Sequence, residues 1–150
     1  MIRNARIDDV EIIRNLINEY AERGRMLFRS LSDIYESLHD FLVCEKDSQV
    51  VGCCAVQIYW KDLAEIKSLA VGEKFQGQGS GSALVRAAIE HCRGLKVPRL
   101  FTLTLEPDFF AKLGFEKVEM NSLPFKVWSD CVRCTKQAQC DEIAMVRVIS

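Results

Sequence analysis

The sequence predicts an α/β fold, and three observations carry the prediction. Segments typical of strands alternate with segments of helical periodicity from residue 1 to about residue 128. A glycine-rich stretch joins one of these strands directly to one of the helices. The composition, 49% apolar and 27% charged over 150 residues, suits one globular domain. We therefore expect a single domain over residues 1–150, with a sheet that is at least partly parallel.

Charge and hydropathy exclude several classes of protein. The formal net charge of −1, from 20 basic and 21 acidic residues, gives no electrostatic reason to bind nucleic acid or an anionic membrane. No apolar run approaches the roughly 18 residues that span a bilayer. The first residues lack the apolar core and cleavage site of a signal peptide. We expect a cytoplasmic protein whose seven cysteines are reduced thiols or metal ligands rather than a disulfide framework.

The start of the first helix is marked by local signals. Asp8 and Glu11 form a capping-box pattern, and Ile7 and Ile12 are spaced as a hydrophobic staple. Apolar side chains then recur with helical spacing, and Gly24 follows as the residue that ends the helix. These signals predict a helix that begins after Asp8 and ends before Gly24.

Strand signals dominate the next part of the chain. A second short helix is expected over 32–39, before strands over 41–44 and 50–59 that a turn at 47–48 joins. The segment 63–71 is a third strand that leads to the glycine-rich stretch. This order predicts two strands joined by a turn and a third strand before the glycines.

The second half of the chain continues the alternation and ends differently. A polar segment of residues 129–141 that holds three cysteines is expected to be an insert before the last strand. The other expected elements are a helix over 83–94 closed by Gly94, a strand over 97–105, a helix over 107–113 stopped by Gly114, and strands over 115–120 and 142–149.

The glycine-rich stretch is the most informative motif. Gly77, Gly79 and Gly81 lie where a strand ends and a helix begins, so backbone N–H groups can converge on an anion, most often phosphate. A P-loop would need Gly-Lys-Ser or Gly-Lys-Thr, which is missing. A dinucleotide fingerprint would lie near the first strand, with an acidic residue about 20 residues later. A glycine-rich helix start without a ligand is the alternative.

The residues of this stretch resemble those of a known superfamily. Gln76-Gly77-Gln78-Gly79-Ser80-Gly81 matches the pattern Arg/Gln-x-x-Gly-x-Gly/Ala, and Lys112-Leu113-Gly114-Phe115 matches a helix that ends in Leu-Gly-Phe before a strand. The chain thereby resembles the GNAT superfamily of acyl-CoA N-acyltransferases from residue 1 to about residue 128. The resemblance implies a mixed, mostly antiparallel twisted sheet flanked by helices.

The resemblance also implies acetyl-CoA as co-substrate. In that family, the strand before the loop contacts the pantetheine arm and the acetyl carbonyl, and the loop amides hold the pyrophosphate. Carried over, the arm would contact Leu69, Ala70 and Val71. The pyrophosphate would lie against Gln76, Gly77, Gln78, Gly79, Ser80, Gly81 and Ser82.

A narrower resemblance concerns the acceptor. The chain is similar to the acetyltransferase domain of N-acetylglutamate synthases, through short pieces in a shared order. These pieces are Ile2-Arg3-Asn4-Ala5, Asp8-Asp9, residues 24–30, Gly52-Cys53-Cys54-Ala55, Glu65-Ile66 and Leu123-Pro124. The implied activity is acetylation of the α-amino group of L-glutamate, in arginine biosynthesis. Another amino acid, a small amine or a protein N-terminus are alternative acceptors, and a homodimer is common for this fold.

Two departures limit what the resemblance implies. The usual synthase carries an amino-acid kinase domain in front, which this sequence lacks, so inhibition by arginine through that domain is not carried over. A cysteine-containing segment also replaces the synthase's basic C-terminal stretch. A non-catalytic module that binds acyl-CoA, or responds to a metal or to redox state, is therefore the alternative from a different class.

The chemistry of amine acetylation selects a few residues. Glu65, on the strand that leads to the loop, is the candidate base for the incoming ammonium group, and a surface ion pair is its alternative role. Arg29 is implied by the resemblance as a ligand of a substrate carboxylate. Lys67 alternates with Glu65 on one strand face and is either a second cation or a counter-charge to Glu65. Phe110 stands where many family members carry a tyrosine as the general acid.

The C-terminal cysteines are candidate metal ligands. Cys131 and Cys134 have the spacing of a metal knuckle, and Cys140 follows five residues later. Three thiols supply three of the four ligands that a zinc site or an iron–sulfur cluster usually needs. Free thiols, or a disulfide formed on handling, are the alternatives.

Overall fold

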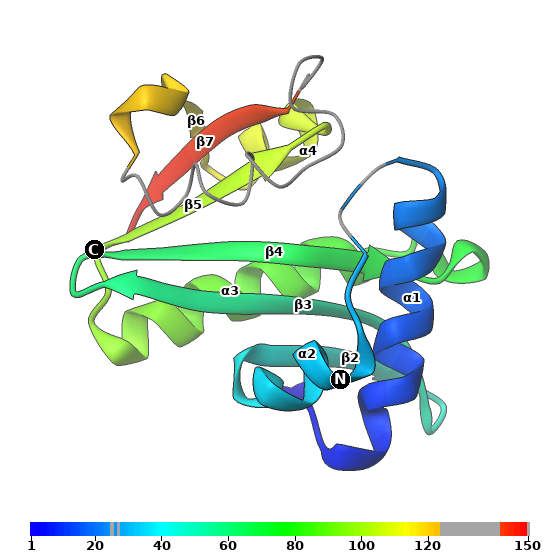
Figure 1. The fold of residues 1–150 in the computed structure, drawn as a ribbon. Coiled ribbons are helices and arrows are strands. Elements are labelled where there is room, and N and C mark those ends of the chain that lie inside the picture. Colours follow the sequence, from blue (N-terminus) through cyan, green and yellow to red (C-terminus); the bar gives the residue numbers. More distant parts are fainter. Residues whose placement is uncertain (25, 27, 124–141, 150) are drawn as a thin grey trace.

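The computed structural model describes residues 1–24, 26, 28–123 and 142–149. From α1 on, its helices and strands follow the order predicted from the sequence, and a short strand that was not predicted, β1, precedes them (Figure 1). In chain order they are β1 (Ile2–Asn4), α1 (Val10–Glu22), α2 (Leu31–Glu36), β2 (Phe41–Lys46), β3 (Gln49–Trp60), β4 (Leu63–Val71), α3 (Ser80–Leu95), β5 (Arg99–Thr104), α4 (Pro107–Ala111), β6 (Glu116–Lys117) and β7 (Ile143–Val148).

The strands form a seven-stranded sheet in the order β1-β2-β3-β4-β5-β7-β6. Within the described residues, β4 and β5 are the one parallel pair, and all other neighbours are antiparallel. Helix α3 connects these two strands, as a crossover between parallel strands requires. The mixed, mostly antiparallel sheet that the resemblance implies is therefore confirmed.

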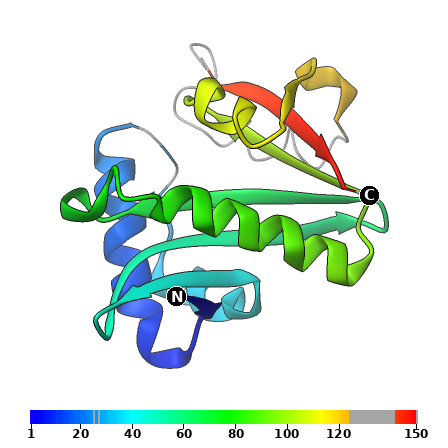
Figure 2. The ribbon, with the colours of Figure 1, turned by 180° about the vertical axis from the view of Figure 1, so that it is seen from behind.

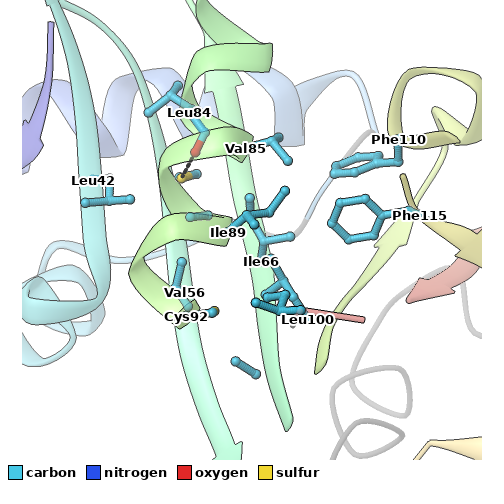
Figure 3. Packing of buried hydrophobic residues seen from close by; sticks show 14 of the residues in the cluster. Leu42, Val56, Ile66, Leu84, Val85, Ile89, Cys92, Leu100, Phe110 and Phe115 are labelled. Carbon is cyan, nitrogen blue, oxygen red and sulfur yellow. Dashed lines mark hydrogen bonds between the residues drawn. The ribbon is translucent and has the colours of Figure 1, made fainter. Parts of the chain in front are cut away.

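Helices cover both faces of the sheet. Helices α1 and α2 lie on one face, and α3 lies on the other (Figures 1 and 2). The apolar stripe of α3 packs on side chains from the central strands, as Figure 3 shows for Leu84, Val85 and Ile89 above Ile66. On the opposite face, Ile13 of α1 is fully buried among residues of β2 and β3.

The start of α1 differs from its prediction by one residue. The predicted cap is wrong: Asp9, rather than Asp8, precedes α1, and its carboxylate accepts the Arg6 N–H at 2.7 Å in the turn before the helix. A short 3-10 turn precedes α1 and shifts the boundary. Ile7 and Ile12 are 62% and 40% exposed, so they do not form the predicted staple. Gly24 has a φ of 70° beyond the helix end, as predicted.

Other boundaries also differ from their predictions. Helix α2 begins at Leu31, where the hydroxyl of Ser30 caps the Asp33 N–H, and it ends three residues earlier than predicted. Helix α3 passes through Gly94 and ends at Leu95, because Lys96 takes the left-handed conformation. Strand β6 is only two residues long. Over the described ranges, no helix combines the length and apolar character needed to cross a membrane.

Candidate active site

The site is built where β4 and β5 separate. These strands pair through Ala64 with Leu100 and Glu65 with Phe101. Strand β4 then runs on to Val71 while β5 diverges from it toward α4 (Figure 1). The separation leaves one edge of β4 away from its neighbour in the sheet, so its backbone groups on that edge need other partners. Glu65 lies at the point where the separation begins.

A bulge follows in β4. Cys53 pairs with Ala70 and Ala55 pairs with Lys67, so Ser68 and Leu69 together face Cys54. Ser68 has a φ of 55°, and the thiol of Cys53 lies 3.6 Å from its carbonyl oxygen. Such bulges bend a strand and re-aim side chains, and they are frequent beside active sites.

Arg29 reaches this bulge from the start of α2. Its Nη1 donates to Ser68 Oγ at 3.1 Å, its Nη2 to Ser37 Oγ at 3.0 Å, and its Nε to Asp33 Oδ2 at 2.7 Å. The guanidinium also lies 5.0 Å from the centre of the Phe41 ring. These bonds use three of five N–H donors, and the side chain is 12% exposed. Arg29 is thus a fixed cation beside the β4 bulge.

Lys67 joins the same neighbourhood. It shares a face of β4 with Glu65, as the strand alternation predicts. Burial raises the pKa of Asp40, and the positive charges of Lys67 and Arg29 act on that carboxyl in the opposite direction. Both cations therefore act on the Asp40 carboxyl.

Glu65 is a buried carboxylate with a donor at one oxygen. It is 6% exposed, and the hydroxyl of Tyr59 donates to Oε1 at 2.9 Å. A buried carboxylate held next to the separation of β4 and β5 can serve as a base for a group bound there.

The glycine loop has the shape of an anion cradle. Gly77 and Gly79 have φ values of 80° and 85°, and a Cβ at either position would meet no atom within 4 Å. Gly79 caps α3, whose first residue, Ser80, has a buried Oγ without a hydrogen-bond partner among the described residues. The open backbone and the orphaned hydroxyl fit the phosphates of a nucleotide cofactor.

The end of β4 is already bonded to other groups. The hydroxyl of Tyr20 donates to Val71 O at 3.2 Å and accepts from Val71 N at 3.3 Å. The Gln76 amide donates to the same hydroxyl at 2.9 Å and to Val71 O at 3.1 Å. A pantetheine arm along this edge would therefore meet Leu69 and Ala70 first and would have to replace Tyr20 at Val71.

Phe110 belongs to the core rather than to the site. It is 4% exposed and packs edge-to-face on Phe109 and Phe115, with ring centroids 5.1 and 5.2 Å apart. The position where many family members carry an acid is thus occupied by an apolar side chain. Helix α4 supplies no proton donor at this position.

The predicted metal ligands cannot be placed. Cys131, Cys134 and Cys140 lie outside the described residues. Within the described part of the chain, no three side chains of His, Cys, Asp or Glu are arranged to hold a metal ion. Cys44, Cys53, Cys54 and Cys92 are buried free thiols there.

Sequence reasoning missed three residues of this region: Tyr20, Tyr59 and Ser68. The helical spacing of α1 explains Tyr20 only as an apolar side chain, although a tyrosine near a helix end has a hydroxyl to satisfy. Tyr59 and Ser68 owe their roles to strand bulges, which depend on cross-strand register and leave no local signal in the sequence.

Comparison with known proteins agrees with this geometry. Residues 10–115 match the model of the acetyltransferase (GNAT) family. An uncharacterised N-acetyltransferase of Chlorobaculum tepidum is 43% identical over 148 residues, which cover 99% of this chain and 96% of that protein. An amino-acid acetyltransferase of Mycobacterium tuberculosis is 36% identical over 89% of this chain and 78% of its own.

Solved structures give the same result. The N-acetylglutamate synthase of Neisseria gonorrhoeae, complexed with coenzyme A and N-acetyl-glutamate, superposes with a TM-score of 0.90 at 29% identity over all of this chain. The chain spans only 35% of that synthase. A Mycobacterium tuberculosis protein in complex with CoA gives a TM-score of 0.86 at 30% identity and is covered over 99% of its length. The chain belongs to the GNAT family and is an N-acetyltransferase.

Proposed function

We propose that the protein transfers the acetyl group of acetyl-CoA to the α-amino group of an amino acid, with L-glutamate as the preferred acceptor. The amino-acid class is supported by the relatives named as amino-acid acetyltransferases. Glutamate is supported by the structural similarity to the gonococcal synthase. With glutamate as acceptor, the reaction belongs to arginine biosynthesis.

The observation that carries the choice of glutamate is the pair of cations at the β4 bulge. Arg29 is held there by Ser37, Ser68 and Asp33. Lys67 lies on the same face of the sheet and acts on the same carboxyl group, Asp40. An acceptor with two carboxylates needs such fixed cations, because guanidinium binds carboxylate through paired hydrogen bonds.

Glu65 supplies the base in this proposal. The α-amino group arrives as an ammonium ion at neutral pH, and Glu65 takes one proton from it, directly or through a water. The freed lone pair forms the C–N bond to the acetyl carbon, and the C–S bond breaks with its electron pair on sulfur. As the C–S bond breaks, the new amide nitrogen releases its second proton to solvent. The thiolate, whose pKa is near 8.5, leaves without a strong acid and takes up a proton from solvent in turn.

Acetyl-CoA supplies the activated acetyl group and binds, in the proposal, through the glycine loop and β4. The N–H groups at Gly77 to Ser82 would hold the phosphates at the N-terminus of α3. The backbone of Leu69 and Ala70, beside the bulge, would orient the arm and donate to the acetyl carbonyl oxygen as negative charge develops there.

The test is thiol release from acetyl-CoA against a panel of amino acids, small amines and N-terminal peptides, with mass spectrometry of the product. The proposal expects turnover with amino acids, and the highest kcat/KM with glutamate. Turnover with another acceptor in preference to glutamate would overturn the choice of substrate. Tight acetyl-CoA binding without any turnover would favour a non-catalytic acyl-CoA-binding module.

Arg29→Ala tests the carboxylate-binding role. Losing one hydrogen-bonded charge pair costs about 1.5–3 kcal/mol, so we expect kcat/KM for glutamate to fall by about 10- to 150-fold, mainly through KM. Arg29→Lys should recover only part of this loss, because an ammonium group cannot form the paired bonds.

Acetyl-CoA affinity, measured by calorimetry, is the control for the integrity of the Arg29 variants. An Arg29→Ala protein that binds acetyl-CoA normally and acetylates glutamate at the wild-type rate would contradict the role. An equal loss with glutamate and with uncharged acceptors would assign Arg29 to the bulge rather than to the substrate.

A further inference from the structure

A second irregularity lies on β3, opposite the start of β4. Ile58 pairs with Ala64, and Trp60 pairs with Leu63. Tyr59 therefore has no counterpart on β4 and is an extra residue in β3. An extra residue of this kind changes the direction in which its side chain points. The strand therefore departs from regular pairing at the position whose hydroxyl meets Glu65.

The contacts of Tyr59 join the two strands that separate at the site. Its hydroxyl donates to Oε1 of Glu65 at 2.9 Å. Its ring packs on Phe101 of β5, with centroids 5.6 Å apart and planes inclined by 49°. Because Phe101 is the residue paired with Glu65, the phenol rests on one member of the pair and bonds to the other.

We propose that Tyr59 is the positioning residue for Glu65. The inference rests on the proposed function, in which Glu65 is the base. A carboxylate that is 6% exposed loses hydration, which disfavours its charged form. The phenol hydrogen bond favours the charged form and fixes the rotation of the carboxylate. Tyr59 thereby keeps the carboxylate of Glu65 ionised and in a fixed orientation, in which it can accept a proton.

The strands around Glu65 present both polar and apolar side chains on its face of the sheet. Among the described residues, β3 presents Gln57 and Tyr59 on this face, β4 presents Lys67, and β5 presents the apolar Phe101 and Leu103. A flexible ammonium group such as that of Lys67 does not orient a carboxylate as a packed phenol does.

The proton balance keeps Tyr59 out of the reaction itself. Glu65 gains one proton when the acceptor ammonium becomes an amine, and it loses that proton to water when the cycle closes. The phenol keeps its own proton in both states and touches neither the amine nor the thioester. Tyr59 thus acts through Glu65 only, which gives the proposal a sharp test.

The first measurement does not depend on turnover. The side-chain carboxyl of Glu65 is titrated by NMR in wild type, Tyr59→Phe and the control Tyr35→Phe, whose tyrosine on α2 is 46% exposed. The proposal expects the pKa of Glu65 to rise by about one pH unit in Tyr59→Phe and to stay unchanged in Tyr35→Phe. An unchanged pKa of Glu65 in Tyr59→Phe would overturn it.

The second measurement is a double-mutant cycle on kcat with glutamate. Tyr59→Phe should lower kcat about tenfold, the worth of one hydrogen bond to a charged group, and leave the KM for acetyl-CoA unchanged. In a Glu65→Gln background, the same substitution should have no further effect. A tenfold loss in both backgrounds would show a structural role and overturn the proposal.

The two hypotheses fail in distinguishable ways. If Glu65→Gln keeps the wild-type kcat and pH profile, Glu65 is not the base and the proposed function loses its mechanism. If Glu65→Gln lowers kcat by about 10² or more while Tyr59→Phe keeps the wild-type kcat and pH profile, Glu65 remains the proposed base and the role of Tyr59 is refuted.

Discussion

Two of the buried cysteines have thiols that are hard to ionise. Burial raises the pKa of Cys53 to about 12 and that of Cys92 to about 11. The thiolate is the reactive form, so these side chains act as small apolar groups. Cys53 also supports the β4 bulge through its contact with the Ser68 carbonyl. Their role is therefore packing rather than catalysis.

Alkylation at pH 8 checks this assignment. With a pKa of about 12, only about one Cys53 thiol in ten thousand is ionised at that pH. We expect Cys53 and Cys92 to react with iodoacetamide at least tenfold more slowly in the native protein than in denaturant, measured by peptide mass spectrometry. Equal rates in the two conditions would contradict the buried placement.

At the scale of the element, an ion pair joins β1 to the start of α1. Arg3 donates to both carboxylate oxygens of Asp9, at 2.8 and 3.1 Å, and also contacts Glu45. The hydrogen bond from Arg3 is the main reason that the pKa of Asp9 lies below its usual value of 3.8. Ionised Asp9 therefore stabilises the fold, and this contribution is lost as the pH falls through its folded-state pKa.

Asp9→Asn tests that contribution. At pH 7 the variant should lose about 1.5–3 kcal/mol of unfolding free energy, because the hydrogen bonds from the Arg3 guanidinium would then reach a neutral amide instead of a carboxylate. The difference in unfolding free energy between variant and wild type should be largest above pH 3.8. It should become smaller below that pH, as Asp9 of the wild type becomes protonated. Denaturant unfolding across this range measures the effect. If the unfolding free energies of wild type and Asp9→Asn differed by the same amount at every pH, this role of Asp9 would be contradicted.

The glycine loop is an element whose function depends on backbone conformation. Gly79 has a φ of 85° at the cap of α3, and a Cβ there would meet no neighbouring atom. A substitution at this position is therefore opposed by the backbone alone, at about 1–2 kcal/mol. Relief of that strain would rotate the N–H groups that we expect to hold phosphate.

Gly79→Ala should weaken CoA binding about 5- to 30-fold, measured by calorimetry, because the strain is relieved only by moving the loop amides. Gly94→Ala is the matched control. Gly94 lies within α3 and also has open space around a Cβ, so this variant should gain up to about 1 kcal/mol of stability and bind CoA normally. Normal CoA binding by Gly79→Ala would contradict the proposal that the loop amides hold the CoA phosphates.

At the scale of the whole molecule, the separation of β4 from β5 organises the site. The glycine loop leads from β4 into α3 on one face of the sheet, and α1 and α2 cover the other face (Figures 1 and 2). Arg29 lies over Phe41, and Lys67 pairs with Ala55; both partners belong to the apolar cluster beneath α1. The geometry allows a cofactor and an acceptor to approach β4 from different directions.

Local chemistry explains which parts of this arrangement were predictable. The turn at Asp47 and Ser48, both with positive φ, and the glycine loop have strong local signals, and the structure bears them out. The cap of α1 was misplaced because a 3-10 turn shifts the register by one residue. Family resemblance, rather than spacing, pointed to Arg29.

Tertiary contacts explain what the sequence could not show. Arg29 and Ser68 are 39 residues apart, and their hydrogen bond depends on the packing of α2 against the sheet. The bulges at Ser68 and Tyr59 follow from the pairing of β3 with β4, which a single strand does not encode. The shortness of β6 likewise reflects pairing with β7, not propensity.

The most direct test of the account is a crystal structure of the protein grown with CoA and N-acetyl-L-glutamate. The measured quantities are the distances from Arg29 to the ligand carboxylates and from the loop amides to the CoA phosphates. The account predicts a carboxylate within hydrogen-bond distance of Arg29, phosphates on the N–H groups at residues 77–82, and the acetyl group beside β4 near Glu65. N-acetylglutamate bound away from the separation of β4 and β5, without contact to Arg29, would contradict it.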